Sequence, residues 1–281
     1  MASSDPDVLT EHLSTGSGAA VVVVGGGVTG LSAAWWLARS GVDVLVLEKG
    51  IVGWEASGRN GGGTTHHFSP LFREEQRLWP QMDELLGYPT EFQPNRIRLS
   101  FDEAQYRVHL KAAQNAEKQG FRWEALDSQQ IGELVPIASR SVHKGLFYHF
   151  GGHANPHRTV QGYAWAAQDH GARISQHTRV TGFSTRAGKV VGVFTDRGQI
   201  GCDSLVLAAG TGSERMASQL DIRIPTASAR VEIVATEPVA KLRYGGIDGN
   251  GLYGRQTLRG NLIYGGGPHS WLAPDEATQN H

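Results

Sequence analysis

Residues 19–48 have the sequence AAVVVVGGGVTGLSAAWWLARSGVDVLVLE. The run from Ala19 to Val24 consists of small and β-branched residues and ends in glycines, which is typical of a parallel strand buried on both faces. Apolar residues at helical spacing follow, and Gly41 stands where a left-handed residue would end a helix. Because Val42 to Glu48 again indicates a buried strand, these residues predict a strand–helix–strand unit.

The glycines between the first strand and the helix have a spacing with chemical meaning. Gly25, Gly27 and Gly30 fit the pattern G-x-G-x-x-G, and Val28 and Thr29 stand between the last two. The first glycine makes the tight turn, the second lets the backbone approach a pyrophosphate, and the third allows close packing of helix on strand. Unpaired N–H groups and the helix dipole favour phosphate at the same place. We therefore expect these five residues to bind a dinucleotide.

An acidic residue follows at the position where such units recognise a ribose. Glu48 ends the second strand roughly twenty residues after the glycines, where a carboxylate can accept hydrogen bonds from both ribose hydroxyls. Lys49 comes directly after it and is included in the predicted cofactor site. The alternative is that the glycines only form turns and that the glutamate is exposed. The joint presence of strand, helix and carboxylate favours a dinucleotide site.

A second glycine-rich stretch, from Gly53 to Gly63, is too irregular for a helix or strand and predicts a loop. In NAD-dependent dehydrogenases the chain usually leaves the nucleotide after the second strand. Here it returns with glycines that let a backbone lie along a flat ligand and with polar side chains that can bind phosphate or ring heteroatoms. The predicted contacts are Ser57, Arg59, Asn60, Gly61 and Gly62. A flexible surface loop is the alternative.

Composition excludes several classes of function. The formal net charge is −1, and no run of Lys or Arg is longer than two, so nothing indicates binding to nucleic acid or an anionic membrane. Cys202 is the one cysteine, which fits a reducing, cytoplasmic compartment. The longest apolar runs are far too short for a membrane span. We expect residues 1–18, which lack a secretion signal, to form a flexible lead-in.

The twelve histidines raise the question of a metal site. His149, His153 and His157 have a spacing that would align them on one face of a helix. Gly151 and Gly152 interrupt such a helix, as does the proline that precedes His157. We therefore predict that these histidines lie in loops and that the protein has no metal site.

These segments resemble the FAD-dependent D-amino-acid oxidase superfamily, in the branch of sarcosine oxidase β subunits, glycine oxidase and opine and amino-acid dehydrogenases. The resemblance covers nearly the whole chain after residue 18. Its motifs are VVVVGGGVTGLSAAWWLARSGVDVLVLEK, EASGRNGGG, GGHANPHR, GARISQHTRVTGF, SLVLAAGTGS and YGRQTLRGNLIYGGG. It implies bound FAD and oxidation of the carbon–nitrogen bond of an amine or amino acid by hydride transfer to the flavin.

The resemblance also implies a fold and further cofactor contacts. Val180 would touch the adenine through its backbone, and Ala209, Gly210 and Thr211 would form a second close approach to the dinucleotide. The expected fold is α/β, with a Rossmann-like FAD-binding lobe interleaved with a sheet-based, antiparallel or mixed substrate lobe that lacks the usual C-terminal segment. The expected boundaries of the FAD-binding lobe are 19–95 and 153–225, and those of the substrate lobe are 96–152 and 226–281.

Fewer residues are available for the flavin ring and the substrate. Relatives with covalent FAD carry the linking histidine where this chain has Arg59, so we predict non-covalent FAD, although His66 and His67 lie nearby and one of them can face the flavin. The family fold turns Tyr253 and Arg255 toward the substrate cavity, where an arginine could bind a carboxylate bidentately. A surface arginine beside a packed tyrosine is an equally favoured alternative.

Three functions are compatible with these features. The leading one is an FAD-dependent oxidoreductase for a secondary amine, an N-methyl amino acid, an opine or a proline-like substrate. The second is a flavin-binding structural or electron-transfer subunit of a hetero-oligomeric dehydrogenase, whose partner subunits carry the catalysis. The third is an NAD-dependent dehydrogenase. Because relatives continue beyond the strand GNLIYGGG, we expect the chain alone to bind FAD weakly and to turn over slowly.

Overall fold

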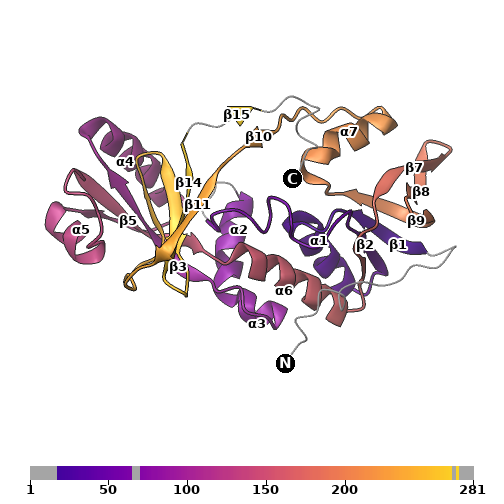
Figure 1. The fold of residues 1–281 in the computed structure, drawn as a ribbon, viewed down its shortest axis with the longest axis horizontal. Coiled ribbons are helices and arrows are strands. Elements are labelled where there is room, and N and C mark those ends of the chain that lie inside the picture. Colours follow the sequence, from indigo (N-terminus) through magenta and orange to yellow (C-terminus); the bar gives the residue numbers. More distant parts are fainter. Residues whose placement is uncertain (1–17, 65–69, 268–269, 272–281) are drawn as a thin grey trace.

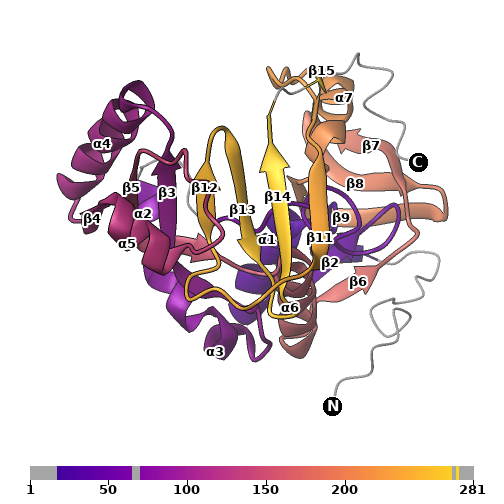
Figure 2. The ribbon, with the colours of Figure 1, turned by 60° about the vertical axis from the view of Figure 1, so that its left-hand side comes forward.

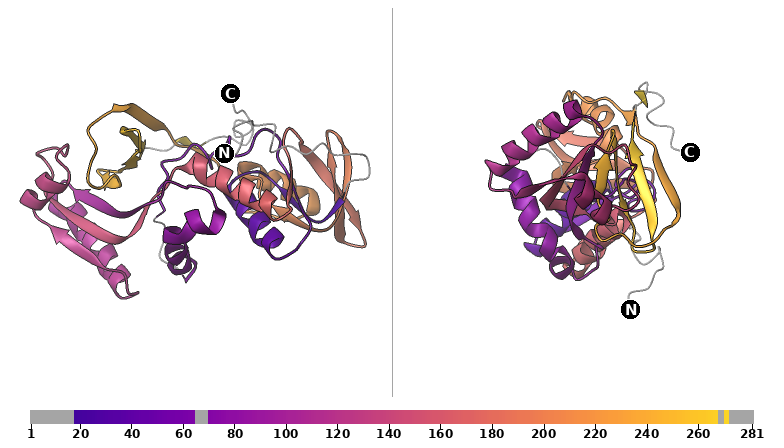
Figure 3. Two further views of the ribbon diagram at one scale, coloured as in Figure 1. Left: turned by 90° about the horizontal axis from the view of Figure 1, so that it is seen from below. Right: turned by 90° about the vertical axis from the view of Figure 1, so that its left-hand side faces the viewer.

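Two β-sheets are built from one interleaved chain in the computed structural model, which describes residues 18–64, 70–267 and 270–271. One sheet has six strands and the other has seven, and they lie toward opposite ends of the long axis (Figures 1 and 3). The chain crosses between the sheets repeatedly, so neither sheet is one continuous stretch of sequence. The predicted α/β fold of two interleaved lobes is confirmed.

The six-stranded sheet contains the predicted strand–helix–strand unit. Its strands are β1 (Gly18–Val24), β2 (Val44–Leu47), β6 (Arg173–Ser175), β7 (Val180–Arg186), β8 (Lys189–Thr195) and β9 (Gly198–Leu207). Their order is β6-β2-β1-β9-β8-β7. β1 pairs in parallel with β2 and β9, and β2 pairs in parallel with β6, whereas β8 is antiparallel to both of its neighbours.

Both faces of β1 and β2 are buried, as their continuous apolar sequence predicts. The helices near this sheet are α1 (Val28–Arg39), α3 (Met82–Leu86), α6 (Pro156–Asp169) and α7 (Ser213–Ala217). Side chains alternate between the faces of a strand. Val23 and Val46 therefore pack against α1 and α6, whereas Val22 and Leu45 pack against the opposite layer, which includes Met216 of α7.

The seven-stranded sheet is mixed and has the order β11-β14-β13-β12-β3-β5-β4. Its strands are β3 (Gln93–Ser100), β4 (Trp123–Leu126), β5 (Lys144–His153), β11 (Ile233–Pro238), β12 (Ile247–Gly249), β13 (Leu252–Gln256) and β14 (Asn261–Gly266). Only the β12–β3 pair is parallel among the described strands of this sheet. Figure 2 shows β12, β13, β14 and β11 side by side.

Helices cover both faces of this second sheet. They are α2 (Pro70–Leu78), α4 (Glu103–Glu117) and α5 (Ser128–Leu134). Leu146 and Tyr148 of β5 pack with Phe72 of α2 and with α4, whereas Phe147 joins the cluster that contains Ile131 of α5. The remaining elements are three 3-10 turns, η2 (Trp79–Gln81), η3 (Gly210–Gly212) and η4 (Ser218–Leu220), and a small ladder of β10 (Ala229–Arg230) and β15 (Ser270–Trp271). In the part of the chain that the structure describes, no helix combines the length and the apolar character that crossing a membrane requires.

The three spaced histidines do not lie in loops as we predicted. His149 and His153 belong to β5, and His157 lies in the first turn of α6. Gly151 and Gly152 belong to the end of β5 and have positive φ angles of 69° and 151°, which a bulged strand end accommodates. Within the described residues, no group of three His, Cys, Asp or Glu side chains is arranged to hold a metal ion.

Candidate active site

A cleft of about 1890 Å³ lies between the two sheets and contains most of the predicted site residues. Among the described residues that line it, positive charge exceeds negative charge. The cations are Lys49, Arg59, Arg158, Arg179, Arg215, Arg230, Arg255 and Arg259, and the acids are Glu48, Glu55 and Glu91. An excess of one sign in a cleft raises the local concentration of ligands with the opposite charge. The cleft therefore suits a large anionic ligand.

The first glycine turn forms one end of the cleft. Gly25 has a φ of +112°, and a Cβ on it would lie 2.3 Å from the carbonyl oxygen of Ala208. A Cβ on Gly30 would lie 2.1 Å from the carbonyl oxygen of Gly25, so this glycine allows α1 to pack closely on β1. Gly27 faces the cleft, and a Cβ there would be 3.0 Å from Ser57 Oγ. The three glycines thus hold one tight backbone turn at the start of α1.

The start of α1 is completed by the second glycine-rich loop. The N-cap residue Gly27 has no side chain, and the backbone N–H of Val28 donates instead to Ser57 Oγ at 3.1 Å. The N–H groups in the first turn of any helix, here those of Thr29 and Gly30, have no partner within the helix. Thr29 and Ser57 both line the cleft. The loop and the helix therefore present hydrogen-bond donors at the same end of the cleft.

Glu48 connects the glycine turn to the end of β2. Its side chain is buried, Oε2 accepts from the backbone N–H of Gly26 at 2.7 Å, and Oε1 accepts from that of Gly50 at 2.8 Å. A carboxylate has about four acceptor positions, so each oxygen retains one for a ligand. Glu48 also lines the cleft. The geometry is compatible with its predicted role toward a ribose, and it adds a structural role that the sequence did not reveal.

Lys49 and Arg59 are held at the mouth of the cleft by the same acid. Glu55 lies 2.9 Å from Lys49 Nζ and 3.2 Å from Arg59 Nη2, and all three side chains are partly exposed. The Arg59 guanidinium also lies over the ring of Trp54, 5.3 Å from its centroid. Arg59 and Lys49 are therefore oriented before any ligand arrives.

Asn60 shapes the loop around the glycines that follow it. Its Nδ2 donates to the carbonyls of Ala56 and Ser57 at 3.0 and 2.9 Å, and its Oδ1 accepts from the backbone N–H of Gly62 at 2.8 Å. Gly62 has a φ of +77°, and a Cβ on it would lie 2.1 Å from the carbonyl oxygen of Ala154. Neither Gly61 nor Gly62 lines the cleft directly, so their backbone is packed behind it.

Four further residues were expected near the dinucleotide. They line the cleft from the side of β1 that faces β9, opposite to β2. Val180 is the first residue of β7 and does not belong to β6, the short strand that begins at Arg173. Ala209, Gly210 and Thr211 form the turn after β9, and Gly210 has a φ of +56°. All four residues line the cleft that Glu48 lines.

Tyr253 and Arg255 line the cleft from β13. The alternative interpretation was a surface arginine beside a packed tyrosine, and the structure shows the reverse. Arg255 is 4% exposed and Tyr253 is 39% exposed, so the arginine is packed and the tyrosine is open. The Arg255 Nε is buried without a hydrogen-bond partner among the described residues, and a Cβ on Gly62 would lie 2.9 Å from it. Burial lowers the pKa of Arg255, and the charge of Glu91 opposes this change. His66 and His67, the other predicted catalytic residues, lie outside the described residues.

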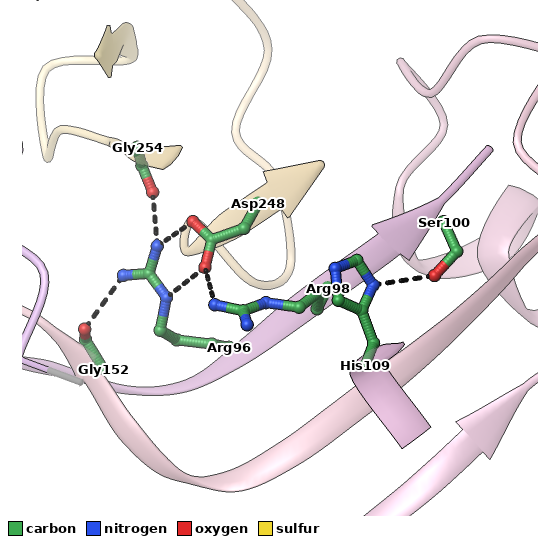
Figure 4. Close-up of polar contacts among 7 residues, drawn as sticks. All are labelled: Arg96, Arg98, Ser100, His109, Gly152, Asp248 and Gly254. Carbon is green, nitrogen blue, oxygen red and sulfur yellow. Dashed lines mark hydrogen bonds and ion pairs between the residues drawn. The ribbon is translucent and has the colours of Figure 1, made fainter. Parts of the chain in front are cut away.

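A buried ion pair below Arg255 was not predicted. Arg96 on β3 donates to both oxygens of Asp248 on β12, through Nε at 3.1 Å and through Nη2. It also donates to the backbone carbonyls of Gly152 and Gly254, at 3.0 and 3.3 Å (Figure 4). Arg98 approaches Asp248 at 3.4 Å. Arg96 therefore connects its own strand β3 to β5, β12 and β13, and on β13 it binds Gly254, the residue next to Arg255.

His153 is buried beside this ion pair. It is 1% exposed, and neither ring nitrogen has a hydrogen-bond partner within the described chain. Burial, with the charges of Arg96 and Arg255, lowers the pKa of His153 to about 3. The ring is therefore neutral near pH 7. The sequence analysis placed it in a loop because Gly151 and Gly152, which directly precede it, interrupt a helical spacing.

Comparison with known proteins assigns the family. A family model described as FAD dependent oxidoreductase matches residues 20–281. The chain belongs to this family. It is 29% identical to the sarcosine oxidase β subunit of Rhodobacter capsulatus, over 92% of this chain and 68% of that protein. It is also 31% identical to the 4-methylaminobutanoate oxidase (formaldehyde-forming) of Paenarthrobacter nicotinovorans, over 79% of this chain and 27% of that protein.

Solved structures of flavoenzymes have the same fold. Glycine oxidase from Bacillus cereus matches 90% of this chain with a TM-score of 0.80 and 25% identity, and this chain covers 71% of that protein. L-Proline dehydrogenase from P. horikoshii matches 92% with a TM-score of 0.82 and 24% identity, and 71% of it is covered. Relative to three sarcosine oxidase β subunits, the chain spans 63% to 68% of their length. The family and its cofactor, FAD, are thus shown, and an NAD-dependent dehydrogenase is not supported.

The cleft fits FAD on its own geometry. The glycine turn leaves no room for side chains where the phosphates would approach, Glu48 is buried with acceptor capacity left, and the lining is rich in cations. Its volume of about 1890 Å³ exceeds the roughly 300–1,000 Å³ of an ordinary small-molecule pocket. A dinucleotide cofactor and a small substrate can therefore share it.

Proposed function

We propose that this FAD dependent oxidoreductase oxidises the carbon–nitrogen bond of an amine or amino acid. The candidates are secondary amines, N-methyl amino acids, opines and proline-like compounds. One observation carries the proposal: a single cleft connects the glycine turn at α1 with Tyr253 and Arg255 on β13. The names of the relatives, sarcosine oxidase β subunit and 4-methylaminobutanoate oxidase, support the same class of substrate.

The adenosine and pyrophosphate are assigned to the first sheet. Glu48 would accept hydrogen bonds from the ribose, and the N–H groups at the start of α1 would donate to the phosphates. The other proposed contacts are Gly25, Gly27, Val28, Thr29, Gly30, Lys49, Ser57, Arg59, Asn60, Gly61, Gly62, Val180, Ala209, Gly210 and Thr211. We propose that the FAD-binding lobe comprises residues 19–95 and 153–225, and the substrate lobe residues 96–152 and 226–281.

The substrate is assigned to the other end of the cleft. When bound, FAD would supply the chemistry of hydride acceptance from the carbon next to the substrate nitrogen, and water would hydrolyse the resulting imine. The protein contributes orientation: Arg255 is fixed by its burial in β13, and Tyr253 lines the cleft beside it with a side chain that is 39% exposed. His66 and His67 follow the glycine-rich loop in the sequence, and we propose them as additional contacts of the ring or substrate.

We also propose that FAD is bound without a covalent link, because the family resemblance implies that Arg59 occupies the position of the linking histidine. Acid precipitation should then release all flavin into the supernatant. Flavin that stays with the pellet would contradict the proposal and would point to His66 or His67 as the link.

Partner subunits are a further part of the proposal. Several relatives are β subunits by name, so their assemblies contain other chains. We propose that this chain acts with partner subunits too. A molar mass from light scattering of the natively purified protein that equals one chain would contradict this.

The experiment that tests the function is spectroscopic. The protein purified with its natural partners should show flavin absorbance, and anaerobic addition of the correct amine or amino acid should bleach it. A panel of sarcosine, proline, an opine and a primary amine separates the candidate substrates. A yellow protein that none of these classes reduces would refute C–N oxidation, and a colourless protein that does not bind added FAD would refute the cofactor assignment.

A further inference from the structure

The loop that contains the second group of glycines, here called the cofactor loop (residues 57–64), ends as an added strand of the second sheet. The backbone N–H of Thr64 donates to the carbonyl of Gly152 at 3.0 Å, and the N–H of Ala154 donates to the carbonyl of Gly62 at 2.9 Å. Reciprocal bonds of this kind pair two antiparallel strands. This end of the loop is therefore attached to the end of β5, on the side opposite to β3.

The other end of the cofactor loop lines the cleft. Ser57 and Asn60 are part of the cleft wall, and Ser57 Oγ accepts from the N–H of Val28 at the start of α1. Asn60 joins this part of the loop to the glycines: its Nδ2 donates to the Ser57 carbonyl at 2.9 Å, and its Oδ1 accepts from the N–H of Gly62 at 2.8 Å. A shift of the attached end is therefore passed on to the residues that face the cofactor.

The attached end is also held from inside the second sheet, by Arg96. Its Nη1 donates to the carbonyl of Gly152 at 3.0 Å, so this one oxygen accepts from Arg96 and from Thr64 of the cofactor loop (Figure 4). A carbonyl oxygen has two lone pairs, and both are used here. The backbone of Gly63 lies against the same guanidinium, because a Cβ on it would be 3.4 Å from Nη1.

The other donors of Arg96 bind two further strands. Nε and Nη2 hold Asp248 on β12, and Nη2 also donates to the carbonyl of Gly254 on β13 at 3.3 Å. Gly254 stands between Tyr253 and Arg255, which line the cleft. The guanidinium is a rigid, planar fork, so its donors cannot move independently of one another. One buried side chain therefore fixes β13 relative to the end of β5 that carries the cofactor loop.

We propose that Arg96 is a positioning residue that holds the cofactor loop and β13, two walls of the cleft, in a fixed relative position. Arg96 does not line the cleft, so it would act on bound FAD only through the backbone that it holds. The inference rests on the proposed contacts between FAD and the cofactor loop. It predicts that changing Arg96 alters the binding and the surroundings of the flavin in the folded protein, in addition to any loss of stability.

Arg96→Lys is the first test, because lysine keeps the positive charge beside Asp248 but lacks the fork that reaches several acceptors at once. The folded apoprotein should bind FAD about tenfold more weakly than wild type, as expected for the loss of one or two hydrogen bonds. The visible circular dichroism of the bound flavin should also change, because it depends on the asymmetric surroundings of the ring. Urea denaturation identifies conditions in which each apoprotein is fully folded.

Arg98→Lys is the matched control. Arg98 lies on the same strand and approaches the same carboxylate, at 3.4 Å from Asp248, but within the described residues it binds neither Gly152 nor Gly254. Its dissociation constant for FAD should stay within about twofold of wild type, as for a partly exposed pair. Its flavin spectrum should be that of the wild type.

A double variant, Arg96→Gln with Asp248→Asn, provides an independent test if Arg96→Lys does not fold. It removes both buried charges, so that neither is left without compensation. The shorter amide cannot hold Gly152 and Gly254 together. The double variant should therefore show the same weaker FAD binding and the same kind of change in the flavin spectrum.

Two results would overturn the positioning role. One is a loss of stability in the Arg96 variants while the dissociation constant for FAD and the flavin spectrum stay those of the wild type, because Arg96 would then only stabilise the sheet. The other is an equal weakening of FAD binding in Arg98→Lys, because the charge near Asp248 would then explain the effect. Either result leaves the proposed function standing if amines or amino acids still bleach the wild-type flavin. A wild-type chain that binds no FAD would refute the cofactor assignment and the positioning role together.

Discussion

The two ends of the cleft are built in different ways. At the dinucleotide end, the deciding contacts are local: Glu48 and the Gly26 N–H that it binds are 22 residues apart. At the substrate end, Arg96 and Asp248 are 152 residues apart and come from strands on different passes of the chain through the second sheet. The first end depends mainly on backbone geometry, and the second depends on buried charge.

This contrast determines how each end should respond to mutation. A backbone cradle is lost when one side chain fills it, while the fold around it persists. A buried ion pair, in contrast, contributes to the stability of the whole sheet, because removing one partner leaves the other charge without compensation. Mutations at the dinucleotide end should therefore change FAD binding. Mutations at the substrate end should change the free energy of unfolding and the selectivity for ligands.

The largest expected effect is the loss of FAD from Gly27→Val. The backbone of Gly27 has a φ of −85°, which any residue adopts, and the nearest atom to a Cβ there is Ser57 Oγ at 3.0 Å. The variant should therefore fold but present a branched side chain where the pyrophosphate would lie. Flavin absorbance per mole of purified protein should fall to background.

Gly132→Ala is the control for that variant. Gly132 lies in α5, and a Cβ there has no atom within 4 Å. This protein should keep the flavin content of the wild type. A Gly27→Val protein with full flavin content would show that the glycine turn does not hold the pyrophosphate.

A large effect on stability is expected from Asp248→Asn. The substitution leaves Arg96 buried without a carboxylate, and breaking such a pair typically costs about 3–5 kcal/mol. Urea denaturation should show this decrease in the free energy of unfolding. Asp43→Asn removes the partly exposed pair with Arg173, which lies at 2.9 Å, and should cost at most about 1 kcal/mol. Equal losses from the two variants would contradict the distinction between the buried and the exposed pair.

The sequence predicted the strand–helix–strand unit and its tight glycine turn for a physical reason. Gly25, Gly30 and Glu48 act within one strand–helix–strand unit, so their spacing along the chain already fixes their spacing in the fold. The parallel strands around them are apolar on both faces, and their composition indicates this burial. The glycine-rich loop was also predicted as irregular, and Ser57 does reach the start of α1.

The substrate end could not be predicted in the same way. Arg96 and Asp248 are ordinary polar residues in their local sequence, and only the pairing of β3 with β12 brings them together. His153 was misassigned because strand β5 ends in a glycine pair that resembles a loop in sequence. Arg255 was indicated, but its burial depends on packing against Gly62, a residue from another part of the chain.

A smaller effect is expected from Glu48→Gln. An amide cannot accept through both positions, so it loses one bond to Gly26 or Gly50 as well as its charge toward the ribose. FAD should bind more weakly by about 1.5–3 kcal/mol, the range for hydrogen bonds to charged groups. Titration of the apoprotein with FAD and with FMN provides the measurement. Because FMN lacks the adenosine, an equal weakening of both would assign Glu48 a role in loop structure alone.

The smallest effect is a change in the pH dependence of stability in His153→Leu. The pKa of His153 is lowered to about 3 by burial and by the charges of Arg96 and Arg255, whereas an unfolded histidine titrates near a pKa of about 6.5. Between these values only the unfolded state binds the proton. The stability that the neutral ring contributes is therefore fully present above about pH 6.5 and is lost as the pH falls toward about 3, at about 1.4 kcal/mol per pH unit.

Carboxylates also make the free energy of unfolding depend on pH in this range. They do so in both proteins, so their contribution cancels in the difference. Urea denaturation of wild type and His153→Leu between about pH 6 and pH 4 should thus show a slope smaller by about 1 kcal/mol per unit in the variant, whatever the packing cost of leucine. Parallel slopes would mean that His153 gains a proton in the folded protein, which would place a compensating acid or solvent beside a ring that the structure shows to be enclosed.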